Sequence, residues 1–265
     1  MKYSVITINY NNAEGLDHTI ESVISQSYTD FEFIVVDGGS TDHSIDVIRK
    51  SEENIDYWVS EKDAGIYNAM NKGINHAHGE YCIFMNSGDC FFNHEVLEKI
   101  NNSSSDADVI VGKVSIDNDN NIISPPPSSG ELTFYHLYSG GIPHQGAFIR
   151  TSFLRKHPYD ENLKIASDWK FFIQSLIFDN CSISFIDEYV AKYNMDGVSS
   201  SNPDLMRREK DLILSSMFPV RVLDDYKRLK DSECLTVSLS LDLKKHYGVD
   251  RILYNLGKIL LKFVN

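Results

Sequence analysis

The sequence is poor in cysteine, in proline and in long apolar runs. Its 265 residues include four cysteines and seven prolines, and no two cysteines stand in the Cys-x-x-Cys spacing that zinc sites and redox motifs use. The cysteines are Cys82, Cys90, Cys181 and Cys234. We therefore expect neither a disulfide framework nor a zinc centre, and a reducing compartment fits this composition.

Two further absences concern membranes. No apolar run approaches the roughly 18 residues that a membrane-spanning helix needs. The N-terminal stretch MKYSVITINYNN has no signal-peptide core or cleavage site and is typical of a strand. These features predict a cytoplasmic protein, and they allow peripheral contact at the inner face of the cytoplasmic membrane.

Basic residues are also fewer than acidic ones. Lysine and arginine total 25 against 38 aspartates and glutamates, so the formal net charge is −13. A surface of that sign repels phosphate backbones, and no nucleic-acid partner is expected. The length and the 42% apolar content suffice for one large globular domain with a buried core.

The first hundred residues contain a regular alternation of strand-like and helix-like segments. Apolar runs of strand length alternate with segments whose apolar residues recur at helical spacing. Strands are predicted at 3–8, 31–36, 55–60 and 80–86, and helices at 15–27, 40–50 and 64–77. This order predicts βαβ units and an α/β fold with a mainly parallel, Rossmann-like sheet flanked by helices.

After residue 105 the alternation is looser. The segments expected there are strands at 107–117 and 182–193, a proline-rich loop at 124–130, a loop entering a strand at 140–150, a helix at 167–177 and helices after 204. We predict one main domain over 1–217, in two halves at 1–105 and 106–217. A helical C-terminal extension, 218–265, follows it.

Polar residues follow each of the first four predicted strands. The stretches are NYNN, DGGSTD, EKDAG and NSGD, and the last three contain Asp37 with Asp42, Asp63, and Asp89. In parallel α/β sheets ligands bind beyond the carboxyl ends of the strands, which meet along one edge. The sequence therefore predicts an acidic, hydroxyl-rich ligand site on that edge.

Two blocks carry a family resemblance that extends over roughly residues 3–200. VVDGGSTD and DAGIYNAMNKGINHAHGEYCIFMNSGD, in this order, resemble the family 2 glycosyltransferases of the GT-A fold. PHQGAFIR and SDWKFF resemble a bacterial subgroup that builds O-antigens, capsules and exopolysaccharides. The resemblance implies an inverting transfer of a sugar from a nucleotide-sugar, a UDP-sugar by expectation, to a saccharide acceptor that is lipid-linked.

The family pattern also assigns the nucleotide-binding residues. Asp37 is expected to accept a hydrogen bond from a pyrimidine N–H, and Asp42 lies on the same turn. Thr7 and Asn9 are expected beside the base, and Asp63 approaches it from the third strand. The alternative for Asp42 is capping of the following helix, and the alternative for Asp63 is a plain turn residue.

NSGD stands where the family has its Asp-x-Asp metal motif. Ser87 occupies the first acidic position, so Asp89 remains as the one acidic ligand and Ser87 is expected to contact the ribose or water. A diphosphate leaving group needs its charge neutralised, and Mg²⁺ or Mn²⁺ bound through oxygen ligands does this. The alternative for Asp89 is a role in the turn that follows the strand.

The resemblance makes 1–105 the half that binds the sugar donor and 106–217 the half that binds the acceptor. The acceptor half contains the candidate base. Asp168 matches the catalytic aspartate of the family, with Ser167 in place of the preceding glutamate, and a helix N-terminus favours its ionised form. His144, in the loop GGIPHQG, is a candidate for binding acceptor or phosphate, or else a structural histidine. Gly197 and Ser199 lie in a glycine- and hydroxyl-rich stretch that either closes over a diphosphate or forms a simple surface loop.

The end of the chain differs from the rest. Residues 242–265 hold five basic and two acidic side chains, and apolar residues recur at helical spacing from Ile252 to Phe263. Peripheral contact of 248–265 with an anionic membrane is one reading. Packing on the core or on a second subunit is the other, and the oligomeric state is not predicted.

Two other functions fit less of the sequence. A sugar nucleotidyltransferase needs a basic, glycine-rich phosphate loop near its start, and NYNNAEG contains no lysine or arginine. A non-catalytic nucleotide-sugar-binding homologue is supported by Ser87 alone, and the presence of Asp89 and Asp168 argues against it.

Overall fold

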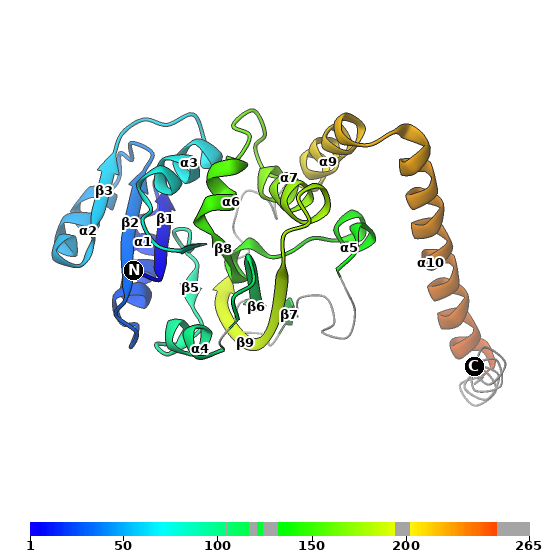
Figure 1. The fold of residues 1–265 in the computed structure, drawn as a ribbon, viewed down its shortest axis with the longest axis horizontal. Helices are drawn as coiled ribbons and strands as arrows, with labels where there is room; N and C mark the ends of the chain where they lie inside the picture. Colours follow the sequence, from blue (N-terminus) through cyan, green and yellow to red (C-terminus); the bar gives the residue numbers. More distant parts are fainter. Residues whose placement is uncertain (104, 117–120, 124–131, 194–201, 248–265) are drawn as a thin grey trace. The chain divides into compact units, whose positions relative to one another are not determined.

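The computed structural model describes residues 1–103, 105–116, 121–123, 132–193 and 202–247. By internal contacts the chain divides into two units, Met1–Ile213 and Leu214–Asn265 (Figure 1). The predicted proline loop, the predicted phosphate residues Gly197 and Ser199, and the predicted membrane segment 248–265 lie outside the described residues.

The first unit begins with the predicted parallel layer. Strands β1 (Tyr3–Asn9), β2 (Phe31–Asp37), β3 (Tyr57–Ser60) and β4 (Tyr81–Phe84) alternate with helices α1 (Ala13–Ile24), α2 (Ser44–Lys50) and α3 (Ile66–His76), with a 3₁₀ turn at Glu52–Asn54. The strands pair in the order β3-β2-β1-β4, all parallel. The predicted α/β fold is confirmed, and the carboxyl ends of these strands share one edge.

The rest of the sheet is mixed. Strand β8 (Ala147–Arg150) runs antiparallel to β4, and β6 (Val109–Ile116), β9 (Ile183–Tyr193) and β5 (Cys90–Phe91) continue the order, while β7 (Asn121–Ile123) pairs with β6. Strand β6 is antiparallel to β8 and parallel to β9. The two- and three-residue strands β5 and β7 were not predicted, because so short a segment has no measurable alternation.

After β5 the chain also forms helices (Figure 1). They are α4 (Val96–Asn102), α5 (Phe134–Ser139), a 3₁₀ turn at His144–Gly146, α6 (Thr151–Lys156), α7 (Ser167–Phe172), α9 (Pro203–Met217) and α10 (Val220–Tyr247). The helix predicted at 167–177 is present, but from Ile173 to Phe178 it continues as a π-helix. Among the described residues, no helix has the length and apolarity that crossing a bilayer requires.

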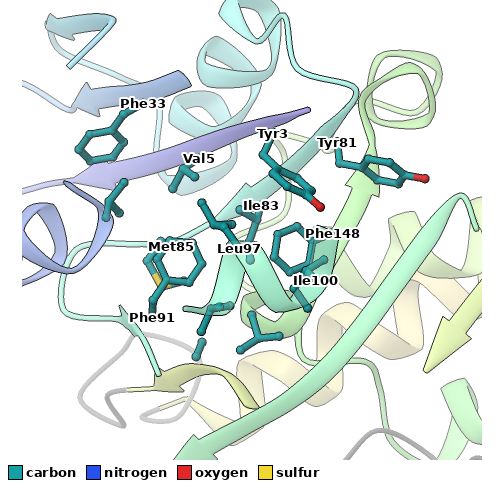
Figure 2. Close-up of a cluster of buried hydrophobic side chains, with 14 of the residues drawn as sticks. Tyr3, Val5, Phe33, Tyr81, Ile83, Met85, Phe91, Leu97, Ile100 and Phe148 are labelled. Carbon is teal, nitrogen blue, oxygen red and sulfur yellow. The ribbon is translucent and has the colours of Figure 1, made fainter. Parts of the chain in front are cut away.

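A largely aromatic and aliphatic core lies against one face of the sheet (Figure 2). Tyr3 of β1 is 1% exposed, and its ring packs edge-on against Phe148 of β8 with centroids 5.3 Å apart. Leu97 and Ile100 of α4 close the same cluster. Because this core joins the parallel strands to the antiparallel β8, it fixes the two halves of the sheet as one body.

Two glycines of the predicted helix 64–77 have different roles. Gly65, at φ 122°, precedes α3 and does not belong to it, so the helix begins two residues later than predicted. Gly73 lies inside α3, where an added Cβ would come within 2.4 Å of the Ile6 Cγ2 atom on β1. The absence of a side chain at Gly73 therefore allows α3 to pack directly on the central strand.

We expect Gly73→Ala to lower the free energy of unfolding. Overpacking against the stiff, fully buried Ile6 costs about 1–3 kcal/mol, and the gain of about 1 kcal/mol in helix propensity offsets only part of this. Chemical denaturation should show a net loss of up to about 2 kcal/mol. The exposed Asn75→Ala on the same helix is the control and should unfold at or above the wild-type midpoint. A Gly73→Ala protein more stable than the wild type would contradict the close packing.

Candidate active site

The ends of three neighbouring strands bring polar side chains together. Asn9 of β1 is the register partner of Asp37 on β2, and Asp37 is the partner of Ser60 on β3. Register partners project from the same face of a sheet, so the three side chains meet at the carboxyl edge. This is the edge on which the sequence predicted the ligand site.

Asp37 is the centre of this group and is 0% exposed. Its Oδ1 accepts from Asn9 Nδ2 at 2.8 Å and from Ser40 Oγ at 2.5 Å. Its Oδ2 accepts from Ser60 Oγ at 2.6 Å and from the backbone amides of Gly39 and Ser40 at 3.1 and 2.9 Å. Burial raises the pKa of Asp37, but these hydrogen bonds outweigh it and hold the pKa below its usual value. Asp37 therefore orders the turn as a buried, ionised carboxylate.

The turn after β2 is joined to the turn after β1. The backbone amide of Asn11 donates to Ser40 Oγ at 2.7 Å, and the backbone amide of Thr41 donates to Asn11 Oδ1 at 2.8 Å. Asn11 adopts φ 49°, a left-handed conformation that asparagine tolerates better than most residues. The two polar stretches NYNN and DGGSTD thus form one interlocked structure.

Asp42 has the capping role that the sequence left open, together with a second role. Its Oδ1 accepts from the amide of Ser44, the first residue of α2, at 3.0 Å. Its Oδ2 accepts from the amide of Ala13, the first residue of α1, at 3.0 Å. One exposed carboxylate therefore serves the beginnings of two helices, and its predicted contact with a nucleotide stays a prediction.

The open part of the edge lies around Gly38. A Cβ on Gly38 would come within 2.5 Å of Asp63 Oδ2 and 3.3 Å of the Tyr10 ring, so this stretch can only be glycine while those side chains keep their places. Asp63 is half-buried, and Tyr10 is 66% exposed. The sequence analysis missed Tyr10, although it directly follows the first strand in NYNN.

Thr7 occupies a different position from the other predicted nucleotide residues. Its side chain is fully buried two residues before the end of β1, and its hydroxyl donates to the Met85 carbonyl oxygen at 2.8 Å. This bond joins β1 to the chain leaving β4. The structure gives Thr7 a supporting contact, and its predicted place beside a base remains a prediction.

The NSGD stretch forms a tight turn after β4. Gly88 has φ 102°, Ser87 is partly exposed and Asp89 is 5% exposed. The Thr19 hydroxyl of α1 donates to the Asp89 carbonyl oxygen at 2.7 Å and holds this turn against α1. The Oδ1 atom of Asn86 is buried and has no hydrogen-bond partner within the described part of the chain.

The donor set at this turn suits a hard divalent cation only in part. Asp89 supplies a carboxylate, but no cluster of three or more His, Cys, Asp or Glu side chains occurs among the described residues. Mg²⁺ is commonly bound through one or two carboxylates together with water and substrate phosphates. Asp89 therefore fits a cation that takes its other ligands from a bound diphosphate, and does not by itself form a site.

Asp168, at the second position of α7, is held through both carboxylate oxygens. Oδ1 accepts from the Tyr67 hydroxyl of α3 at 2.9 Å, and Oδ2 lies 3.2 Å from His144 Nδ1. On the other side of its ring, His144 Nε2 lies 3.4 Å from Asn86 Nδ2. The structure thus brings the candidate base, the candidate histidine and the turn after β4 into one chain of contacts. Tyr67 was missed, although it lies within the family-like block DAGIYNAMN.

The protonation of this group follows from its geometry. Burial raises the pKa of Asp168, but the contacts with His144 and the Tyr67 hydroxyl outweigh burial and place the pKa below its usual value. Burial lowers the pKa of His144, and the facing Asp168 carboxylate more than compensates and raises it. Burial and Asp168 together strongly raise the pKa of Tyr67. Asp168 is therefore ionised near neutral pH, and Tyr67 stays a hydroxyl donor.

A groove of about 810 Å³ lies elsewhere on the first unit. It is lined by Asn71, Ile74, Asn75, Leu154, Arg155, Pro158, Tyr159, Asp160, Glu161 and Lys170. None of the predicted site residues is among them. Its polar walls are largely occupied by internal contacts, such as Asp160 with Lys170 at 2.6 Å and Asn71 with Glu161 at 2.9 Å.

Comparisons with known proteins agree with this arrangement. The sequence model described as Glycosyl transferase family 2 matches residues 4–163. A Mycobacterium tuberculosis protein named as an uncharacterized glycosyltransferase is 32% identical over 204 residues, covering 74% of this chain and 76% of its own. A Mycobacterium bovis protein named PGL/p-HBAD biosynthesis glycosyltransferase is 26% identical over 228 residues, covering 83% and 88%.

Solved structures show the same fold. S. aureus TarS 1-349 in complex with UDP-GlcNAc has a TM-score of 0.66 at 24% identity, over 80% of this chain and 65% of that one. This chain spans only 39% of the TarS chain in a longer structure. The Pyrobaculum calidifontis mannosyltransferase PcManGT, in complex with GDP-Man and Mn²⁺, has a TM-score of 0.54 at 18% identity, over 72% of this chain and 56% of that one.

The matched region contains all of the parallel layer except Tyr3, together with the turn around Asp37 and the turn around Asp89. Both the sequence relatives and the folds therefore converge on one conclusion. This chain belongs to glycosyl transferase family 2 and is a glycosyltransferase of the GT-A fold.

Proposed function

We propose that this glycosyltransferase moves a sugar from a UDP-sugar to a hydroxyl of a saccharide acceptor, with inversion at the anomeric carbon. The observation that carries the proposal is the chain of contacts from Asn86, at the turn after β4, through His144 to Asp168. It places a carboxylate beside the edge where a donor diphosphate would bind. A base next to a leaving-group site is the arrangement that glycosyl transfer requires.

The donor side rests on the turn around Asp37. Because Asp37 has no exposed surface and accepts five hydrogen bonds, its contribution to nucleotide binding is to fix the backbone of DGGSTD. Asp63 presents the accessible carboxylate for a pyrimidine N–H, and the exposed ring of Tyr10 offers a stacking face for a base. TarS, which has the same fold, binds UDP and UDP-GlcNAc in its solved complexes, and this supports a UDP-sugar.

We assign stabilisation of the leaving diphosphate to Asp89 and a divalent cation, Mg²⁺ or Mn²⁺. The fold neighbour PcManGT was solved with Mn²⁺ and a nucleotide-sugar, which supports the assignment. When bound, such a cation neutralises charge that develops on a departing diphosphate. Asp89 would hold it, and the partly exposed Ser87 would contact water or ribose at the same turn.

Asp168 is assigned as the base that accepts the proton of the acceptor hydroxyl. As the acceptor oxygen bonds to the anomeric carbon and the bond to the diphosphate breaks, the hydroxyl proton passes to this carboxylate. Tyr67 and His144 each hold one oxygen and so set the direction in which Asp168 faces. The lowered pKa keeps Asp168 in the ionised form that can accept a proton, although it also makes Asp168 a weaker base.

The acceptor is assigned as a saccharide, lipid-linked, in the synthesis of a surface polysaccharide. The support is the resemblance of PHQGAFIR and SDWKFF to enzymes of that kind, and the PGL/p-HBAD biosynthesis relative. A basic, apolar segment at 248–265 would suit contact with an anionic membrane where such an acceptor is found.

Replacing Asp37 should weaken UDP binding. We expect Asp37→Ala to lose about 1.5–3 kcal/mol of binding free energy, because the turn loses the charged acceptor of its hydrogen bonds. Calorimetric titration with UDP measures this, and circular dichroism checks that the variant is folded. Asp46→Ala, which removes an exposed carboxylate from α2, is the matched control. Wild-type affinity in a folded Asp37→Ala protein would refute the assigned role.

Removing the cation should abolish transfer. Because a single carboxylate would hold it, we expect excess EDTA to stop turnover and Asp89→Asn to require a markedly higher Mn²⁺ concentration for half-maximal rate. Ser87→Ala is the control at the same turn and should change the Mn²⁺ requirement little. Undiminished turnover in EDTA would instead indicate an enzyme that works without a metal.

Asp168→Asn should retain UDP binding and lose turnover. The amide keeps the shape of the side chain but cannot take a proton, and loss of a general base typically lowers the rate by about 10²–10⁴-fold. Steady-state transfer or donor hydrolysis measures the loss, with Asp187→Asn, a 93% exposed carboxylate, as the control. A wild-type rate for Asp168→Asn would move the role of base to His144.

A further inference from the structure

Helix α9 places a buried carboxylate directly before the helix of the candidate base. Glu209 is 8% exposed, and it accepts hydrogen bonds from three consecutive backbone amides. Oε1 accepts from Lys164 at 2.7 Å, and Oε2 accepts from Ile165 and Ala166 at 3.0 Å each. These amides lead straight into α7, whose second residue is Asp168. The orientation of that stretch of backbone therefore depends on a side chain more than 40 residues away.

The next residue of α9 contacts the second loop of the site. Lys210 Nζ donates to the Gly140 carbonyl oxygen at 3.0 Å, and Gly140 begins the loop that leads to His144. The same ammonium lies 4.7 Å from the centroid of the Trp169 ring, which belongs to the residue after Asp168. Trp169 in turn donates through Nε1 to the Leu137 carbonyl oxygen of α5 at 2.9 Å. One lysine thus contacts both segments.

The contact between His144 and Asp168 needs these two segments to stay in place. The two residues come from separate loops, and their 3.2 Å contact lasts only if both loops keep their relative position. Glu209 fixes the loop before Asp168, and Lys210 fixes the loop before His144. Because the two residues are adjacent on one helix, α9 holds both loops from a single rigid element.

We propose that Glu209 and Lys210 are positioning residues of the transferase, which hold Asp168 and His144 in their reactive arrangement. This inference rests on the proposed function, because it takes Asp168 as the base. Both residues lie beyond residues 4–163, the part of the chain that the family model matches. We call the two residues and their contacts the α9 clamp.

The chemistry of Glu209 explains why a carboxylate is needed at this position. Three N–H donors converge on it, two of them from the buried residues Ile165 and Ala166, and each bond is charge-assisted. Glutamine keeps one oxygen, which can serve Ile165 and Ala166, but turns an NH₂ group toward the amide of Lys164. Alanine leaves all three amides without this acceptor. The series Glu, Gln, Ala at position 209 therefore weakens the α9 clamp in steps.

Kinetics of the variants test the proposal. We expect Glu209→Ala to lower kcat about 10- to 100-fold, the range expected when a catalytic group is displaced by about 1 Å. The dissociation constant for UDP should stay within about two-fold of wild type, because the donor turn is separate. The kcat of Glu209→Gln should lie between those of the wild type and Glu209→Ala. Lys210→Met should lower kcat about three- to ten-fold by the same displacement. Asp211→Ala and Arg208→Met, exposed neighbours on α9, are the matched controls and should leave kcat and the dissociation constant for UDP unchanged.

Hydrogen–deuterium exchange gives a readout that does not depend on activity. Amides 164–166 should exchange faster in Glu209→Ala than in Asp211→Ala, while the amides of β1 and β2 should be unchanged. Ile48→Val and Ile48→Ala, on the buried face of α2, provide variants of lowered melting temperature in which the clamp is intact. Should Glu209→Ala fail to fold, Glu209→Gln and Lys210→Met carry the test.

The outcomes separate this inference from the proposed function. A loss of kcat beyond that of an Ile48 variant with the same melting temperature, together with faster exchange at 164–166, supports the α9 clamp. Unchanged kcat in Glu209→Ala, or a loss no larger than that of the Ile48 variant, overturns it and leaves the proposed function standing. A wild-type protein that neither binds UDP nor turns over any nucleotide-sugar overturns both.

Discussion

The buried carboxylate of Asp37 is the constraint on which the ligand edge of the sheet depends. It accepts two bonds through Oδ1 and three through Oδ2, and the donors come from the ends of β1 and β3 and from its own turn. A buried charge is tolerable only when such donors surround it, since an unpaired one would cost several kcal/mol. The same requirement fixes the turn in one conformation. Two further bonds extend this order to the turn after β1: the Asn11 amide donates to Ser40 Oγ, and the Thr41 amide donates to Asn11 Oδ1.

The group around Asp168 is ordered in a similar way, by contacts between segments far apart in the chain. Asp168 is held by Tyr67 from α3 and by His144 from the loop before β8. His144 Nε2 also lies 3.4 Å from Asn86 Nδ2, just after β4, so one imidazole ring contacts both Asp168 and the turn after β4. The mixed part of the sheet makes this possible, because β8 runs antiparallel beside β4 and brings its preceding loop to the same edge.

The parallel part of the sheet could be predicted from the sequence more closely than the mixed part, for physical reasons. The parallel strands are buried on both faces and are long enough to show as apolar runs, so β1, β2 and β4 were located within one or two residues. Helix α3 began later than predicted, because Gly65 takes a left-handed conformation before it. The short strands β5 and β7 and the short helix α6 depend on tertiary pairing and have no local period of their own.

The family, the parallel layer and the acidic turns could be predicted from the sequence, because these consist of contiguous residues whose pattern is local. The sequence placed Asp37, Asp89 and Asp168 in three separate stretches without showing how they relate. The folded structure was needed to show that Asp37 is buried and organises its turn, and that Tyr67 bonds to Asp168 from 101 residues away. It was also needed to show that Glu209 supports the backbone ahead of Asp168. Such contacts are set by the packing of helices on a sheet, and nothing in the spacing of the residues along the chain encodes them.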